Sequence, residues 1–227
     1  MKLLAVVIPA KDEEAAIGEL LVRIAAVRVR DHELRAFVVD DGSTDDTARI
    51  AEEHGATVIP HPENRGLGAA VRTGLRTVVE AGASTIAYLD ADLEYFPEDI
   101  PRLVEPILAG RAEYVLGSRF LGGVRGMRLY RRVGNHAFTG LLSMLTGQKI
   151  TDGQTGMRAF SLGAAASAEI VHDYNYAQVL TLDLVRKGFA MEEVPIRYKV
   201  REHGRSFISW RYPAKVLPAI WRELRSP

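Results

Sequence analysis

Two carboxylates, Asp90 and Asp92, stand two residues apart directly after the apolar run of residues 85–89. If this run is a strand, both side chains point the same way, because side chains alternate along an extended chain. Two negative charges that close repel each other unless a cation lies between them. Hard cations such as Mg²⁺ and Mn²⁺ prefer carboxylate oxygens, so the sequence predicts a divalent-cation site at this strand end.

A second acidic pair, Asp40 and Asp41, follows the apolar run of residues 36–39 and leads into Gly42-Ser43-Thr44. Either pair alone has a simpler interpretation, because Asp often caps the N-terminus of the helix that follows. Two acidic strand ends in one chain favour a site for a metal-bound phosphate ester.

The composition is that of an ordinary globular protein, with 227 residues, 47% hydrophobic and 26% charged. The absence of Cys excludes disulfides and thiolate metal sites. No apolar stretch approaches the roughly 18 to 20 residues that a membrane-spanning helix needs. The apolar run in residues 1–9 is too short for a secretory signal, so a cytoplasmic location is expected.

The net charge of zero conceals a division along the chain. Residues 1–118 contain 12 Lys and Arg against 21 Asp and Glu, whereas residues 119–227 contain 17 against 8, so the halves carry −9 and +9. Residues 119–149 contain six basic residues and no acidic one. Such a division suits a substrate with phosphates or an anionic surface, although scattered solvated arginines are the simpler alternative.

The first half alternates between strand and helix patterns, which predicts right-handed βαβ crossovers and a mostly parallel sheet with helices on both faces. In such sheets ligands bind at the carboxyl ends of the strands, where both acidic pairs lie. Predicted strands occupy residues 3–9, 34–40, 57–60, 85–90 and 113–117, and predicted helices occupy residues 12–27, 45–54, 68–81 and 97–108.

After residue 118 this alternation breaks. No internal repeat or linker is found, so one domain over residues 1–227 is expected, with residues 1–118 and 119–227 as its two parts. The predicted elements are a basic loop at 120–128, a helix at 130–146, a turn and strand at 151–160, a helix at 176–187, a strand at 190–197, a basic loop at 199–209 and an amphipathic segment at 210–224.

Several motifs follow one another in order from residue 5 to about residue 210. They are IP at 8–9 before DE at 12–13, VDDGSTD at 39–45, NRGLG at 64–68, DADL at 90–93, GSR at 117–119, TDGQTGMR at 151–158, VPI at 194–196 and GRS at 204–206. In this order they resemble family 2 glycosyltransferases of the GT-A fold. Within that family the chain resembles the dolichol-phosphate mannosyltransferase group of polyprenyl-phosphate glycosyltransferases.

This resemblance implies an α/β GT-A fold with a single, mostly parallel mixed sheet flanked by helices. It implies an inverting, metal-dependent transfer of a hexose (mannose, glucose or N-acetylhexosamine) from a GDP- or UDP-sugar to a polyprenyl phosphate. Residues 1–118 would bind the nucleotide sugar and residues 119–227 the acceptor. The reaction would be one in-line displacement at the anomeric carbon, helped by Mg²⁺ or Mn²⁺.

On the donor side, the resemblance implies that Pro9, Lys11, Glu13 and Asp41 line the nucleotide base and ribose. Asp90, Ala91 and Asp92 would bind the donor diphosphate, the two carboxylates through the metal. The group often has Gln two residues after this motif, whereas this chain has Glu94, which is predicted here as a third metal ligand.

Arg119 would be a catalytic residue that faces the donor or the acceptor phosphate and takes part in nucleotide-sugar binding. Asp152 stands where inverting members of the wider family place a catalytic base. An acceptor phosphate is already ionised at neutral pH, so Asp152 is predicted to position rather than to remove a proton. Surface exposure of the arginines and turn capping by Asp152 are the simpler alternatives. Arg128, Arg131, Arg132 and Arg205 are predicted to bind the acceptor phosphate, and Arg201 the donor.

Residues 210–224 combine Trp and Tyr with Arg and Lys, which is typical of a helix in a membrane interface. Peripheral association with the cytoplasmic face of the membrane is therefore expected; packing on the sheet or on a membrane-protein partner is the alternative. Two other functions remain open: a family 2 transferase with a soluble or glycan acceptor, and a non-catalytic nucleotide-sugar-binding subunit. Nucleic-acid binding is not expected, because half the chain is acidic and the basic segments lack stacking aromatics on a sheet.

Overall fold

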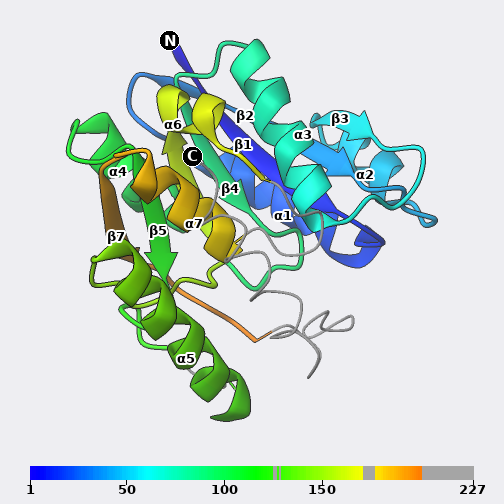
Figure 1. Ribbon diagram of the computed structural model, residues 1–227. Helices are drawn as coiled ribbons and strands as arrows, with labels where there is room; N and C mark the ends of the chain where they lie inside the picture. Colours follow the sequence, from blue (N-terminus) through cyan, green and yellow to red (C-terminus); the bar gives the residue numbers. More distant parts are fainter. Residues whose placement is uncertain (125–126, 128, 171–176, 201–227) are drawn as a thin grey trace.

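The structure is a computed structural model, and it describes residues 1–124, 127, 129–170 and 177–200, with the backbone alone at residues 130 and 131. Its framework is a seven-stranded mixed sheet with the order β3-β2-β1-β4-β6-β5-β7 (Figure 1). All neighbouring strands pair in parallel except β6, which runs antiparallel to β4 and β5. The strands are β1 (Lys2–Ala10), β2 (His32–Asp40), β3 (Thr57–Pro60), β4 (Thr85–Leu89), β5 (Tyr114–Ser118), β6 (Met157–Ser161) and β7 (Met191–Pro195).

The predicted helices are confirmed within a few residues. They are α1 (Glu14–Ala26), α2 (Thr47–Glu53), α3 (Leu67–Glu80), α4 (Ile100–Leu108) after the short 3₁₀ turn η1 (Pro97–Asp99), α5 (Leu129–Thr146) and α7 (Ala177–Arg186). The short helix α6 (Leu162–Ser167) was not predicted. It begins directly after β6, where the Ser161 side chain accepts a hydrogen bond from the backbone N–H of Ala164 and caps the helix.

The sheet is buried on both faces, as expected for parallel strands covered by helices. In β1, the side chains of Leu4, Val6 and Ile8 pack with α1 and α4, and those of Ala5 and Val7 pack with α3 on the other face. This alternation fixes the register of β1, because a slip of one residue would exchange the two sets of side chains.

Strand β6 decides which segments meet at the carboxyl edge of the parallel strands. Because β6 is antiparallel, with Met157 opposite Leu89, its N-terminal end lies beside the carboxyl end of β4. Residues 152–156 are therefore brought to the edge that also carries the loops after β1, β2, β4 and β5. The sequence predicted a strand within residues 151–160, but its position between β4 and β5 was not foreseen.

Helix α5 projects beyond the sheet, past the end of β5 (Figure 1). The sequence pattern placed Val133, Ala137, Phe138, Leu141, Leu142 and Leu145 on one face. The structure divides this set: Leu142 is buried in the core, whereas Val133 and Ala137 are exposed. Among the described residues, no helix combines the length and apolar character that crossing a bilayer requires.

Candidate functional site

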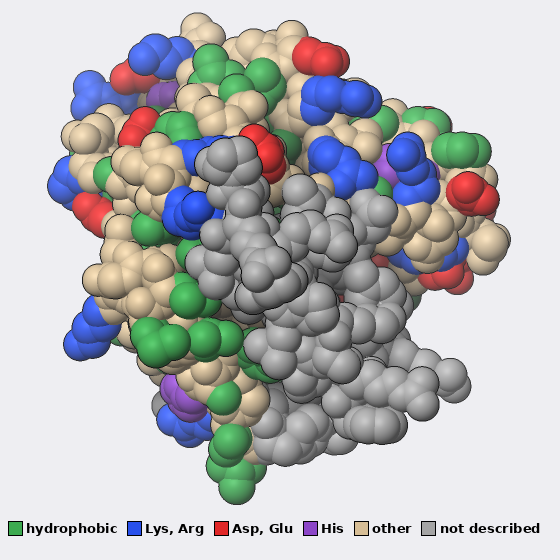
Figure 2. Space-filling model, viewed as in Figure 1, with side chains coloured by type: hydrophobic (Ala, Val, Ile, Leu, Met, Phe, Trp, Pro, Cys, Tyr) green, Lys and Arg blue, Asp and Glu red, His purple; other side chains and the backbone are tan. Residues whose placement is uncertain are grey.

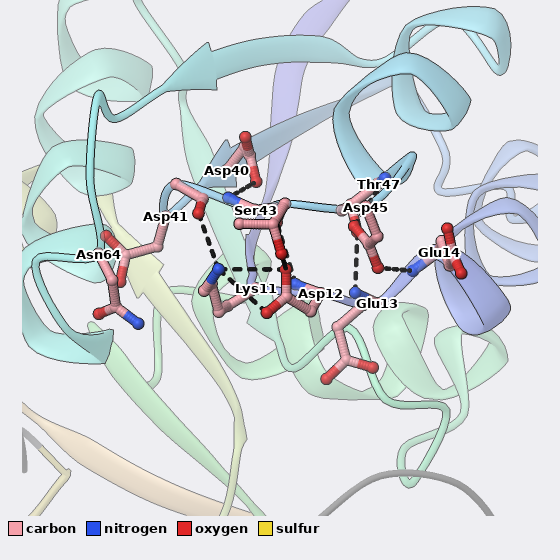
Figure 3. A network of polar contacts seen from close by, with 12 residues as sticks. Lys11, Asp12, Glu13, Glu14, Asp40, Asp41, Ser43, Asp45, Thr47 and Asn64 are labelled. Carbon is pink, nitrogen blue, oxygen red and sulfur yellow. Dashed lines mark hydrogen bonds and ion pairs between the residues drawn. The ribbon is translucent and has the colours of Figure 1, made fainter.

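The loops after β1 and β2 are joined by a polar network (Figure 3). Lys11 Nζ donates to the carbonyl oxygen of Gly42 at 2.7 Å and forms an ion pair with Asp12 at 3.0 Å. The Asp12 carboxylate accepts from the backbone N–H of Thr44 at 2.8 Å, and this hydrogen bond is the main cause that lowers the pKa of Asp12. Asp12 has a φ of 52°, which is uncommon outside glycine, so the network holds a specific loop conformation.

The same network fixes the start of α1. Asp45 accepts hydrogen bonds from the backbone N–H of Glu14 at 3.2 Å and from the hydroxyl of Thr47. Thr47 in turn accepts from the backbone N–H of Glu13 at 2.8 Å. In Figure 3 the carboxylate of Glu13 points away from these contacts, whereas its backbone takes part in them. Pro9 is buried in β1, the strand that leads into this loop.

Asp41 is buried at the end of β2 and anchors the segment that follows β3. Its carboxylate accepts from the backbone N–H groups of Arg65 at 2.9 Å and Gly66 at 2.8 Å. His61 Nδ1 lies 2.7 Å from the same carboxylate, and His61 Nε2 lies 3.0 Å from the hydroxyl of Thr73. Both Asp41 oxygens therefore have partners within the chain.

Asp90 follows β4 and is partly buried. Its carboxylate accepts a hydrogen bond from the Tyr88 hydroxyl at 2.6 Å, and Asp92 accepts from the backbone N–H of Glu94 at 3.1 Å. Burial and the negative charge of Asp92 raise the pKa of Asp90 to about 7, against the effect of Tyr88. A carboxylate pair whose ionisation is opposed in this way suits a divalent cation, which would supply the missing positive charge.

Glycine is required where β6 approaches Asp90. A Cβ atom on Gly156 would overlap the Asp90 carboxylate. The backbone N–H of Gly156 donates to the hydroxyl of Tyr95 at 2.7 Å, so the segment before β6 is fixed against the loop after β4. Leu93, within that loop, has a φ of 59°, a further sign that its conformation is imposed by its surroundings.

Tyr198, which sequence reasoning missed, connects the loop after β4 to Arg119. Its hydroxyl donates to Glu94 Oε2 at 3.1 Å, and the Arg119 guanidinium carbon lies 5.3 Å from the centre of its ring. The backbone N–H of Lys199 donates to the carbonyl oxygen of Glu94 at 2.9 Å. Residues 198 and 199 therefore lie beside the loop that carries the predicted metal ligands.

Arg119 and Asp152, both predicted as site residues, contact each other in the structure. Arg119 donates through Nε at 2.7 Å and Nη2 at 2.8 Å to the two Asp152 oxygens, and through its backbone N–H at 3.1 Å. Asp152 is fully buried. Glu193 accepts from the backbone N–H groups of Thr151 and Asp152 at 2.8 and 3.0 Å, and burial raises its pKa. Asp152 is thus placed to hold Arg119 in position.

Arg158 is a second buried arginine; it ends the TDGQTGMR motif, but no role was predicted for it. It lies in β6 with no exposed surface and donates to the carbonyl oxygens of Thr155 at 3.1 Å and Gly153 at 3.2 Å. It also donates to the hydroxyls of Tyr114 and Thr181. Its charge acts to lower the pKa of Asp90. An arginine between Met and Ala in an apolar strand was the available signal.

The remaining predicted arginines either lie on the exposed surface of α5 or fall outside the described residues. Arg132 is exposed on α5. Arg128, Arg201, Arg205 and residues 210–224 lie outside the described residues, and Arg131 is described by its backbone alone.

The three carboxylates Asp90, Asp92 and Glu94 do not converge on one point. Within the described ranges, no group of three or more His, Cys, Asp or Glu side chains is arranged to hold a metal ion. Glu94 is bound instead by Tyr198, which leaves Asp90 and Asp92 as the two-carboxylate candidate. A cavity of about 360 Å³ lies away from this edge, with Met1, Leu21 and His32 among its lining residues, and it contains no predicted site residue.

The fold matches that of a known glycosyltransferase. A crystal structure of glucosyl-3-phosphoglycerate synthase from Mycobacterium tuberculosis, in complex with Mn²⁺, uridine diphosphate and glucosyl-3-phosphoglycerate, aligns with a TM-score of 0.75 and 22% sequence identity. The alignment covers 100% of this chain and 81% of that chain. This likeness confirms the expected GT-A fold.

Residues 5–166 match the family described as glycosyl transferase family 2. A dolichyl-phosphate hexose transferase of Haloferax volcanii is 35% identical over 204 residues, which make up 87% of this chain and 83% of that protein. A UDP-N-acetylglucosamine–dolichyl-phosphate N-acetylglucosaminyltransferase of Methanococcus voltae is 33% identical over 183 residues, 72% of this chain and 71% of that protein. The chain therefore belongs to glycosyl transferase family 2.

Proposed function

We propose that this protein transfers a hexose from a nucleoside-diphosphate sugar to a polyprenyl phosphate. Relatives named as dolichyl-phosphate transferases support this acceptor class. The observation that carries the proposal is that Asp90 and the Arg119–Asp152 ion pair lie at the same edge of the sheet. The Asp90 carboxylate, whose pKa is raised by burial and by Asp92, lies beside the segment that leads from the Arg119–Asp152 ion pair into β6.

On the donor side, Asp90 and Asp92 would hold Mg²⁺ or Mn²⁺. Such an ion, when bound, neutralises charge on the leaving nucleoside diphosphate. The loops of Lys11 and Asp41 are fixed by their own hydrogen bonds, so they form a rigid edge for the base and ribose. Rigid positioning of this kind lowers the entropy cost of bringing donor and acceptor together. In this proposal Glu94 accepts the hydrogen bond from Tyr198 and does not bind the metal.

On the acceptor side, Arg119 would bind a phosphate oxygen with the N–H groups that Asp152 leaves free. Asp152 is a positioning residue, because it contacts Arg119 and has no exposed atoms. The phosphate oxygen of the acceptor attacks the anomeric carbon without a general base, because it is already ionised. Arg128, Arg131, Arg132, Arg201 and Arg205 are proposed to add to this basic region. We also propose that residues 1–227 form a single domain.

A transfer assay with purified protein tests the proposal. Labelled GDP- and UDP-hexoses are offered with Mn²⁺ or Mg²⁺ and one of three acceptors: a short-chain polyprenyl phosphate in detergent, 3-phosphoglycerate, or none. A prior thermal-shift panel selects the donor, because a ligand that binds the folded state raises the melting temperature. We expect label in the polyprenyl product alone. Transfer to 3-phosphoglycerate alone would favour a soluble acceptor, and donor binding without transfer to any acceptor would favour a binding subunit.

A further inference from the structure

Arg158 differs from most basic residues of this chain because its side chain is entirely buried. Figure 2 shows Lys and Arg side chains spread over the surface of the molecule, as is usual for charged residues, whereas Arg158 has no exposed surface. Taking a charged group out of water is costly unless close polar contacts replace the lost hydration. The contacts of the Arg158 guanidinium therefore indicate what the residue does.

The first contacts of Arg158 hold the turn that leads into β6. Its Nε donates to the carbonyl oxygen of Thr155 at 3.1 Å, and its Nη2 donates to the carbonyl oxygen of Gly153 at 3.2 Å. One rigid, planar group thus binds two carbonyl groups of the same turn. A lysine ammonium does not present donors in such a planar fork, so it would not hold both carbonyl groups in this geometry.

The other contacts of Arg158 join this turn to β5 and α7. Its Nη1 donates to the hydroxyl of Tyr114 in β5. The same nitrogen donates to the hydroxyl of Thr181 at 3.1 Å and to the carbonyl oxygen of Ala177 at 3.0 Å, both in α7. The Tyr114 and Thr181 hydroxyls lie 3.0 Å from each other. The turn is therefore anchored to two elements that carry no residue of the candidate site.

The turn held by Arg158 lies between the two parts of the candidate site. Just before it, Asp152 forms the buried ion pair with Arg119. Just after it, Gly156 approaches Asp90 so closely that a Cβ atom would overlap the carboxylate. The conformation of the turn therefore sets the distance between the Arg119–Asp152 pair and Asp90.

We propose that Arg158 is a positioning residue, which holds residues 153–155 and thereby keeps the donor and acceptor sides of the site in register. The inference rests on the proposed function, because it takes Asp90 as part of the donor side and Arg119 as part of the acceptor side. An apolar side chain would fill the position of Arg158 with a smaller desolvation cost, but it would lose both hydrogen bonds to the turn.

Amide hydrogen exchange, measured by NMR on the full-length protein, tests this inference without sugar transfer. Arg158→Met removes the hydrogen bonds, and Arg158→Lys keeps the charge without the planar fork. The N–H groups observed are those of Gly153 and Gly156, which donate to the hydroxyls of Thr139 and Tyr95. Their exchange rates are divided by those of the β1 amides. We expect this ratio to rise at least about tenfold in Arg158→Met and by a smaller factor in Arg158→Lys.

Ile24→Ala is the matched control for a general loss of stability. Ile24 is buried in α1 and lines the cavity that lies away from the site, so its truncation weakens the core without touching the turn. A general loss of stability accelerates exchange in the whole sheet, so the ratio should not rise in this variant. If Arg158→Met does not fold, Tyr114→Phe removes one acceptor of Arg158, and the ratio should rise by a smaller factor.

Binding of Mn²⁺ with uridine or guanosine diphosphate, measured by calorimetry, is the second measurement. We expect binding about tenfold weaker in Arg158→Met and unchanged in Ile24→Ala, because a displaced Gly156 disturbs Asp90. An unchanged exchange ratio in Arg158→Met would overturn the inference, as would wild-type behaviour of Arg158→Lys in both measurements. So would a raised ratio with unchanged nucleotide binding. Failure of the proposed function is distinguishable, because the wild type itself would then bind neither nucleotide, while the exchange ratio would still report on the turn.

Discussion

The Arg119 guanidinium and the Asp152 carboxylate form a buried ion pair with two side-chain hydrogen bonds of 2.7 and 2.8 Å. Asp152 has no exposed surface, and its backbone N–H donates a hydrogen bond to the Glu193 carboxylate. A carboxylate in this position orients a cation. This geometry agrees with the interpretation that Asp152 positions a group rather than removes a proton, which stays a prediction until it is tested.

Removing the Asp152 charge should impair the acceptor side and spare the donor side. Asp152→Asn keeps the shape but leaves Arg119 buried without its counter-ion, which costs about 3 to 5 kcal/mol of stability. We expect a higher KM for polyprenyl phosphate and a lower kcat, with unchanged donor affinity measured by calorimetry. The double variant Arg119→Met, Asp152→Leu should regain much of the lost stability without regaining activity. Near-normal turnover by Asp152→Asn would show that Asp152 is not needed to position Arg119 for the reaction.

Asp90 should make the stability of the metal-free protein depend on pH. Its pKa is about 7 in the folded protein and near the ordinary 3.8 in the unfolded chain. The folded state therefore favours the protonated form, and the contribution of Asp90 to stability falls as the pH rises from about 4 to about 7. Asp90→Asn should abolish this fall. The measurement is the unfolding free energy in the presence of a chelator at several pH values. If this free energy changed with pH equally in the variant and the wild type, the prediction would be refuted.

Gly156→Ala should disturb Asp90 without removing any polar group. The added methyl group would overlap the Asp90 carboxylate, so either the carboxylate or β6 must shift. We expect a destabilisation of about 1 to 3 kcal/mol and weaker binding of Mn²⁺ with nucleoside diphosphate, measured by calorimetry. Gly134→Ala is the matched control, because nothing lies near its Cβ position in α5 and alanine favours helix. Unchanged binding in Gly156→Ala would show that the close approach has no consequence for the site.

Tyr198 and Glu94 should be energetically coupled. Tyr198→Phe removes the hydrogen bond of 3.1 Å to Glu94 but keeps the ring beside Arg119. In a double-mutant cycle with Glu94→Ala, we expect a coupling energy of about 1 kcal/mol in the free energy of unfolding. If Glu94 were instead a metal ligand, Glu94→Ala would weaken Mn²⁺ binding strongly and Tyr198→Phe would not. If the two substitutions changed the free energy of unfolding additively, the hydrogen bond would make no contribution to stability.

The sequence predicted the parallel strands and the sheet edge that carries the candidate site, because apolar runs alternate with helical periods and acidic residues follow two of the runs. It could not predict that β6 enters the sheet antiparallel between β4 and β5. Hydrophobic pattern shows that a strand is buried but not which strands are its neighbours. For the same reason the contact between Gly156 and Asp90 was visible only in the structure.

The individual partners of the site residues were harder to predict. The Arg119–Asp152 pair joins residues 33 positions apart, and spacing alone does not reveal such a contact. Tyr198 had no motif to mark it, because a single Tyr next to basic residues is common on protein surfaces. Helix α5 was predicted, but the sequence did not show which of its apolar residues are buried, since exposed and buried apolar positions look alike in sequence.

The most direct measurement of the central claim is hexose transfer to polyprenyl phosphate by the double variant Asp90→Asn, Asp92→Asn. Asp31→Asn serves as control, because Asp31 is exposed and distant from the motif in sequence. The account predicts that the double variant remains folded and loses at least about a hundredfold in kcat/KM, while the control keeps wild-type activity. Full transfer by the folded double variant would contradict it.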